Sequence, residues 1–396
     1  MRSLNLFDLT LAVAITLVVQ VAISLLGACT PVLAPEIARE RGWNVTMIAF
    51  YPALMCISLF WISFYVPGLL ARMGGMGLGL ACIVVSAVGL FGLLAPTLSL
   101  VALVPLAIGL ASGCMTPASA QVLGPRTSPQ TAGLIMSIKQ TGVPFGAMLA
   151  GVLVPRLVLR SGWHQAVVEL AAGGVALAIL VLPLVRWLNG PPVADKARLF
   201  QPFEPARQLA AMPGMFKLLI AGMTFVAMQH CLRSFFTVYL VHNLGFSLGV
   251  AGLAYGVSQA AGIAGQIVWA IVSDRLLTAH TVIAAIGVLM TSAASLTAAF
   301  RPDWSVPSII AVAAIFGVSA SGFLPVLLGE LIRKAPPGQA GALTSGSQVF
   351  LTPAALVGPL LFGGVASVLD YSAAFATLAA CTLVGSVMAA TTRPMQ

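Results

Sequence analysis

Charged residues are scarce in this sequence. Asp, Glu, Lys and Arg make up only 7% of its 396 residues, whereas 59% of the residues are hydrophobic. In soluble proteins about a quarter of the residues are charged, because a folded domain must cover itself with polar surface. The composition therefore excludes a soluble globular protein and predicts an integral membrane protein.

Short alternating patterns, which would indicate a transmembrane β-barrel, are also missing. The apolar runs are about 20–28 residues long, and a helix needs about 20 apolar residues to cross the hydrocarbon core. We predict an all-α membrane protein with twelve transmembrane helices in two pseudo-symmetric six-helix bundles. The predicted spans are 9–33, 46–70, 76–95, 98–123, 131–155, 163–188, 215–241, 247–272, 279–299, 305–332, 340–366 and 372–391.

Runs of basic residues are absent, although the net charge is +9. Single basic residues in short loops do not indicate nucleic-acid binding, and we expect none. With a cytoplasmic N-terminus, the loops of that face hold twelve Lys and Arg, and the loops of the other face hold five. This bias places both termini in the cytoplasm. We expect a monomeric, multi-pass protein of the bacterial inner membrane.

Clusters of metal-ligating residues are absent too. The six cysteines lie singly in apolar segments, and no C-x-x-C or H-E-x-x-H sequence occurs. We therefore expect no metal and no cofactor. Leu26-Gly-Ala-Cys29 resembles a lipoprotein cleavage site, but the apolar run around it is too long for a signal peptide and eleven further spans follow.

One long polar connection divides the chain. It contains five prolines between Arg186 and Lys217, and it predicts an N-terminal bundle (1–188), a cytoplasmic linker (189–214) and a C-terminal bundle (215–396). A shift of 208 residues aligns the halves, as an internal duplication would. The aligned pairs are Gly109 with Gly317, Pro117 with Pro325, Arg126 with Lys334, Pro129 with Pro337, Gly133 with Gly341, and Gln140 with Gln348. Parallel repeats around a site at mid-depth form a transporter architecture.

Two loops carry a more specific pattern. The loop after the eighth span, Gly265-Gln-Ile-Val-Trp-Ala-Ile-Val-Ser-Asp274-Arg275, resembles the motif of the major facilitator superfamily, in which an Asp-Arg pair caps the cytoplasmic end of a helix. The matching loop after the second span, Gly68-Leu-Leu-Ala-Arg72-Met-Gly-Gly, departs from the motif because it lacks the aspartate. The resemblance implies a secondary transporter that works by alternating access, with these four residues in a gating or structural motif.

A segment of the fifth span resembles a narrower group. Ser137-Ile-Lys139-Gln-Thr-Gly-Val-Pro144 is similar to the corresponding stretch of bacterial cyanate-permease-like carriers. This group is associated with small anions. The resemblance therefore implies a small anionic substrate that binds between the two bundles.

Acidic residues are missing at mid-membrane depth, but two basic residues are present there. Lys139 lies about nine residues into the fifth span, which is about 12–14 Å deep, and Arg233 lies about nine residues inside the outer end of the seventh. A centred lysine costs about 2.5–3.5 kcal/mol on insertion scales. Two buried cations without a countercharge therefore favour an anionic substrate. The alternative is a structural role, in which a cation contacts backbone carbonyls or pairs with Glu169 or Glu330.

Neutral polar residues at similar depth extend the predicted binding site. They are Gln140, its repeat mate Gln348, Gln20, Gln229, His230 and Tyr255. Each of them alone is also suited to a structural hydrogen bond between helices. His230 titrates near neutral pH and is a candidate to carry a coupled proton, while exchange against a counter-anion is the other open form of coupling.

Three other functions are compatible with a helical membrane protein. A proton-coupled exporter of amphipathic or drug-like compounds shares the architecture, but it should show a carboxylate at mid-span. A membrane sensor would carry a soluble signalling domain, and this sequence shows none attached. An intramembrane enzyme needs a catalytic pair, and Ser137 and Lys139, two residues apart on one helix, point about 200° away from each other. We therefore expect a transporter and not an enzyme.

Overall fold

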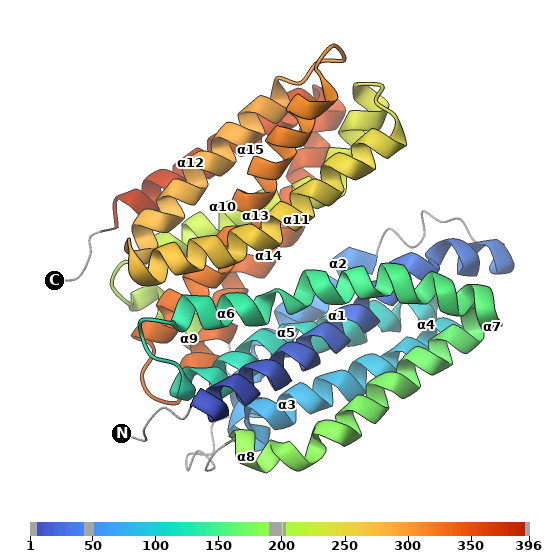
Figure 1. Ribbon diagram of the computed structural model, residues 1–396, viewed down its shortest axis with the longest axis vertical. Helices are drawn as coiled ribbons and strands as arrows, with labels where there is room; N and C mark the ends of the chain where they lie inside the picture. Colours follow the sequence, from blue (N-terminus) through green and yellow to red (C-terminus); the bar gives the residue numbers. More distant parts are fainter. Residues whose placement is uncertain (1–5, 43–50, 190–199, 201–202, 393–396) are drawn as a thin grey trace. The chain divides into compact units, whose positions relative to one another are not determined.

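The computed structural model describes residues 6–42, 51–189, 200 and 203–392, and all regular elements in these residues are helical (Figure 1). Ten helical runs among them are long and apolar enough to cross a membrane. The all-α membrane fold predicted from composition is therefore confirmed.

The helices follow the predicted spans closely. They are α1 (Leu6–Arg41), α2 (Tyr51–Ser63), α3 (Val66–Leu90), α4 (Leu98–Val101), α5 (Leu103–Leu123), α6 (Ala132–Gln140), α7 (Gly142–Val181), α8 (Val185–Asn189), α9 (Glu204–Ala211), α10 (Met215–Val238), α11 (Leu248–Arg275), α12 (Ala279–Ala298), α13 (Val306–Lys334), α14 (Ala340–Val368) and α15 (Tyr371–Ala390). Short 3-10 turns follow α3, α5 and α7, and a π-helical turn, Tyr239–Asn243, follows α10.

Two predicted loops are reduced to single glycines. The predicted loop between the second and third spans is only a break at Gly74 (φ 70°) inside α3, and the loop between the fifth and sixth spans is a break at Gly162 (φ 78°) inside α7. Glycine adopts positive φ without the steric cost of a Cβ, so one residue can interrupt each helix. The apolar run Ala132–Asn189, 58 residues long, thus contains both the fifth and the sixth predicted spans.

The first helix is longer than predicted. The predicted span 9–33 matches the apolar, membrane-spanning part of the helix, Phe7–Leu33, and α1 continues beyond it to Arg41. Polar contacts support the extra turns: Arg39 pairs with Glu36 at 2.5 Å, and the Arg41 guanidinium donates to the Leu93 carbonyl at 2.8 Å. Residues 46–50 of the second predicted span lie outside the described residues.

The chain forms two compact units. Unit 1 contains residues 1–127, 138–205 and 335–349, and unit 2 contains residues 128–137, 206–334 and 350–396. The segments 128–137 and 335–349 thus group with a different unit from their sequence neighbours. The predicted boundary at 189–214 remains a prediction, and most of residues 190–202 lie outside the described residues.

Matching helix pairs recur in the two units. In unit 1, α2 and α3 pack against α5, and in unit 2, α11 and α12 pack against α13 (Figure 1). The repeat mates Gly109 and Gly317 make the closest approaches: a Cβ at Gly109 would collide with Met55 and Ser58 of α2, and a Cβ at Gly317 would collide with the backbone of Ser258 in α11. Both units therefore rely on the same close contact between their second and fourth spans.

Candidate functional site

Lys139 lies at a break in a membrane-spanning segment. Helix α6 ends at Gln140 and α7 begins at Gly142. Pro144 causes this break, because proline has no N–H to donate to the carbonyl of Gln140 four residues earlier. The backbone at Thr141 keeps helical dihedral angles (φ −60°, ψ −19°), so the break is a missing hydrogen bond and not an unwound segment.

The Lys139 ammonium is fully buried in unit 1 and is surrounded by neutral acceptors. Its Nζ donates to Gln20 Oε1 at 2.6 Å, Gln140 Oε1 at 2.9 Å and Thr116 Oγ1 at 3.4 Å. Within the described part of the chain, no carboxylate pairs with it. The positive charge is therefore hydrogen-bonded but not neutralised.

Two glycines of α7 bring Gln20 to Lys139. A Cβ at Gly142 would lie 3.0 Å from Gln20 Cγ, and a Cβ at Gly146 would collide with the Val21 carbonyl oxygen of α1. Helix α1 can therefore pack directly on the backbone of α7. The Gln20 amide is also oriented, because its Nε2 donates to Ser24 Oγ at 3.1 Å and its Oε1 is left to face Lys139.

Thr116 contacts Lys139 but was not predicted as a site residue. A single threonine in an apolar span has no pattern that distinguishes it from a structural one. Ser137 is buried, and its hydroxyl has no hydrogen-bond partner among the described residues. It does not contact Lys139, in agreement with the rejection of a Ser–Lys catalytic pair.

Arg233 lies on α10 in unit 2 and has an exposed side chain. No described carboxylate forms an ion pair with it, and Tyr255 of α11 is close enough for an electrostatic interaction. His230 lies one turn before Arg233, and its Nδ1 is 3.0 Å from the Val226 carbonyl of the same helix. Gln229 and Tyr255 are half-buried. Because Arg233 and Lys139 belong to different units, their convergence on one substrate stays a prediction.

Gln348 of α14 belongs to unit 1 and is half-buried. Its Oε1 is buried and has no hydrogen-bond partner within the described residues. A buried acceptor without a donor is costly, so a donor from water or a ligand would stabilise this side chain.

Asp274 is the most highly connected of the motif residues. One carboxylate oxygen accepts from the Gly133 N–H at 3.1 Å and from Arg333 at 2.8 Å, and the other accepts from the Leu134 N–H at 2.7 Å. The carboxylate thus caps the start of α6, where the first N–H groups have no helical partner. Gly133 is required here, because a Cβ would lie 2.7 Å from the Asp274 oxygen.

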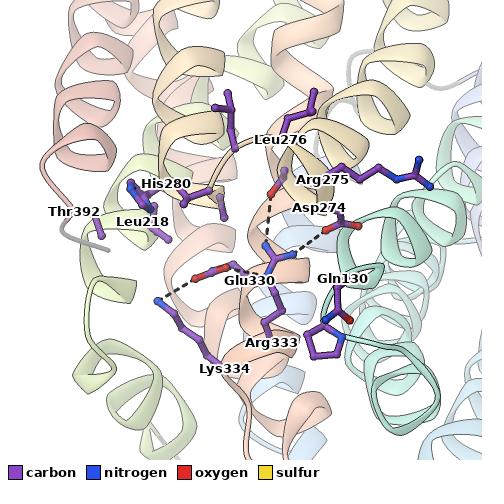
Figure 2. Close-up of a pocket in the computed structure, with 15 residues that line it drawn as sticks. Gln130, Leu218, Asp274, Arg275, Leu276, His280, Glu330, Arg333, Lys334 and Thr392 are labelled. Carbon is purple, nitrogen blue, oxygen red and sulfur yellow. Dashed lines mark hydrogen bonds and ion pairs between the residues drawn. The ribbon is translucent and has the colours of Figure 1, made fainter. Parts of the chain in front are cut away.

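The ion pairs continue from Asp274 along α13 (Figure 2). Glu330 pairs with Arg333 at 3.0 Å and with Lys334 at 3.1 Å, and Lys334 also donates to the Pro213 carbonyl at 3.1 Å. Glu330 is therefore engaged at the end of its own helix and pairs with neither Lys139 nor Arg233. Arg275, the other residue of the motif, is exposed and pairs with no described carboxylate.

Residues 68–75, the counterpart of the Asp274–Arg275 motif in the first half of the chain, are not held by a carboxylate of the described residues. Gly68 is buried and Arg72 is exposed, with no ion pair to a described carboxylate. The side chain of Asn189 holds this loop instead, since its Oδ1 accepts from the Met76 N–H at 2.7 Å and its Nδ2 donates to the Met73 carbonyl at 2.9 Å. Asn189 was not predicted as a motif residue, because it lies 115 residues from Gly74 in the sequence.

The comparison with known protein families identifies the chain's family. Its sequence matches the family described as the Major Facilitator Superfamily over residues 15–298 and again over 218–395. The chain belongs to the Major Facilitator Superfamily. Members of this superfamily are transporters and not enzymes, so the expectation of a non-enzymatic protein is confirmed. A similar protein is an uncharacterized MFS-type transporter of Mycobacterium tuberculosis, 23% identical over 270 residues. This match covers 68% of the present chain but only 59% of the relative.

Solved structures of the superfamily share the fold across nearly the whole chain. The human organic anion transporter MFSD10 matches with a TM-score of 0.75 at 16% identity, covering 96% of this chain and 98% of that one. The Escherichia coli fucose:proton symporter FucP matches with a TM-score of 0.74 at 17% identity, covering 98% and 100%. A bacterial homologue of the iron transporter ferroportin matches with a TM-score of 0.68 at 17% identity, covering 96% and 97%. At these identities the similarity shows the fold alone.

Proposed function

We propose that this protein is a secondary transporter that moves a small anion across the bacterial inner membrane by alternating access between its two six-helix bundles. The observation that carries the proposal is the Lys139 ammonium, which is fully buried, is held by three neutral oxygens and has no described carboxylate beside it. Arg233 is the proposed second cation, and coupling to a proton and exchange against a counter-anion are both compatible with the proposal.

The energetics favour an anion at this position. At about 4 Å, two opposite unit charges attract by about 4 kcal/mol at an effective dielectric constant of 20. This is comparable to the cost of placing a lysine at mid-membrane depth, about 2.5–3.5 kcal/mol. The amides of Gln20 and Gln140 can also rotate to present their NH₂ groups to an anion. Each amide that leaves Lys139 then gains a hydrogen bond to the anion.

The fold does not decide the substrate, because similar structures include an organic anion transporter and a fucose:proton symporter. The proposal for the substrate therefore rests on the side chains. The buried lysine and the resemblance to cyanate-permease-like carriers favour small inorganic anions or small carboxylates. One protein with a similar structure is named as an organic anion transporter, so anion transport is compatible with this fold.

Solute uptake tests the proposal directly. Purified protein is first screened by thermal shift against cyanate, nitrate, formate, succinate and benzoate, and anions that stabilise it are then tested as labelled solutes in proteoliposomes. Lys139→Met keeps the length of the side chain and removes the charge, and we expect it to lower uptake at least tenfold. Lys217→Met is the matched control, because Lys217 donates to the exposed Thr391 at a helix end and to no other described residue.

The outcomes separate the two interpretations. Loss of uptake in Lys139→Met but not in Lys217→Met supports a charge contact with the substrate. If folded Lys139→Met protein retains the uptake of the unmodified protein, Lys139 is structural and the proposal fails. Thermal shifts with cations and none with anions would also contradict it.

A further inference from the structure

A pocket of about 610 Å³ lies in unit 2, where α11 ends and α12 begins. The end of α13 and residues Pro129 and Gln130 also line it (Figure 2). The distribution of basic residues predicts this end of the protein to face the cytoplasm. The pocket is separate from the Lys139 group, which belongs to unit 1.

The charges of this pocket do not balance. Three permanent cations line it, Arg275, Arg333 and Lys334, against two carboxylates, Asp274 and Glu330. Both carboxylates are already engaged in ion pairs with Arg333 and Lys334. The surplus is one positive charge, and it resides on Arg275, which stays outside the ion pairs drawn in Figure 2. A ligand with a single negative charge would neutralise the pocket.

The rim of the pocket is apolar directly beside Arg275. Leu276 is 74% exposed and Leu277 is 48% exposed. Both residues line the pocket, and both lie at the end of a membrane-spanning helix. A leucine pair at this depth can contact acyl chains, while Arg275 reaches the phosphate level of the bilayer.

We propose that this pocket binds the phosphodiester of an anionic phospholipid, with Arg275 on the phosphate and Leu276 and Leu277 against the first carbons of the acyl chains. Basic pockets at the cytoplasmic ends of transmembrane helices bind such head groups. The single surplus charge matches a phosphodiester, which carries one negative charge. Free phosphate offers the same chemistry to Arg275, but it carries closer to two charges at neutral pH and makes no use of the leucines.

Lipid titration of the detergent-purified full chain tests the proposal. The probe is dioleoylphosphatidylglycerol, the reference is dioleoylphosphatidylcholine, and the readout is the midpoint of thermal unfolding as a function of lipid concentration. We expect phosphatidylglycerol alone to raise the midpoint. Arg275→Gln should weaken its apparent affinity about five- to tenfold. Arg301→Gln is the matched control, an exposed arginine in the loop at the other end of α12, and should change nothing.

Two further arms identify the source of the phosphate. Leu276→Ser/Leu277→Ser should weaken binding of phosphatidylglycerol, and inorganic phosphate at millimolar concentration should not reproduce the shift. Equal shifts with both lipids, or an unchanged affinity in Arg275→Gln, would overturn the proposal. The proposal would also be overturned if inorganic phosphate raised the midpoint of thermal unfolding and the leucine substitutions did not change this rise. The pocket would then be a site for free anions. Because Lys139→Met should keep the lipid response, failure here is distinguishable from failure of the proposed transport function.

Discussion

Residues 68–75 in α3 and 265–275 at the end of α11 contain the predicted ends of the second and eighth spans, and they stabilise the two units in different ways. In unit 2, the Asp274 carboxylate binds two N–H groups of α6 and the guanidinium of Arg333. In unit 1, the neutral amide of Asn189 binds the backbone on both sides of Gly74, and Arg72 stands without a described ion pair. In unit 2, a charged carboxylate therefore connects α11 with α6 and α13. In unit 1, the neutral amide of Asn189 holds residues 68–75 in place.

The difference shows what remains fixed in a duplicated fold. The close helix contacts at Gly109 and Gly317 recur, because any side chain larger than hydrogen would collide with a backbone there. The polar contacts at the loops do not recur, because several chemical groups can satisfy the same N–H and carbonyl groups. Substitutions in the two loops should consequently have unequal effects.

The largest effect is expected for Asp274→Ala. The Asp274 side chain is only 3% exposed, so its removal leaves the start of α6 uncapped and Arg333 with one carboxylate partner fewer. Breaking a buried ion pair from one side costs about 3–5 kcal/mol. The free energy of unfolding in a detergent titration should fall by about 3 kcal/mol or more. Asp274→Asn keeps an acceptor for one N–H, so its loss should be smaller; equal losses would show that the charge is unimportant.

Next in size is Gly146→Ala, which tests close packing in unit 1. The added methyl group would collide with the Val21 carbonyl and would push α1 away from α7. Overpacking of this kind costs about 1–3 kcal/mol. Because Gln20 lies on α1, the hydrogen bond from Lys139 should lengthen and uptake should fall together with the midpoint of thermal unfolding.

Gly151→Ala is the control for this substitution. Gly151 lies on the same helix with open space around the position of a Cβ. Alanine has a higher helix propensity than glycine by about 1 kcal/mol, so Gly151→Ala should be neutral or stabilising. If both substitutions behave alike, the contact between α1 and α7 is looser than the structure indicates.

A smaller effect is expected for Asn189→Ala. The substitution removes two hydrogen bonds at Gly74, and each contributes about 0.5–1.5 kcal/mol. Asn189 is only half-buried, so water can replace part of the loss. We expect a decrease of about 1 kcal/mol in the free energy of unfolding, clearly less than for Asp274→Ala. A decrease as large as that of Asp274→Ala would contradict the proposed contrast between the loops.

Composition and the length of the apolar runs predicted the helical membrane fold and the place of nearly every span, because a bilayer demands long apolar helices. The breaks at Gly74 and Gly162 were predicted as loops, since nothing local shows that one glycine suffices. Lys139 and Gln20 were predicted as site residues from their depth, but their direct contact was not, because it depends on how α1 packs on Gly142 and Gly146. Thr116 and Asn189 act through partners far away in the sequence, and such pairs leave no periodic pattern.

The smallest effect is expected for Arg72→Asp, which introduces the missing acid into the first-half loop. Residue 72 lies two positions before the break at Gly74, and the helical backbone of α3 starts again directly after that break. A carboxylate near a helix N-terminus contributes about 0.3–1 kcal/mol, and a cation at the same place is unfavourable. Arg72→Asp should therefore unfold at a higher temperature than Arg72→Ala. The unfolding temperature of Arg72→Ala should in turn be equal to or higher than that of the unmodified protein. Because Arg72 is exposed, added salt should reduce the difference. If Arg72→Asp unfolds at a lower temperature than Arg72→Ala, a carboxylate at residue 72 cannot cap the helix. The amide of Asn189 would then have taken over the role of the missing aspartate.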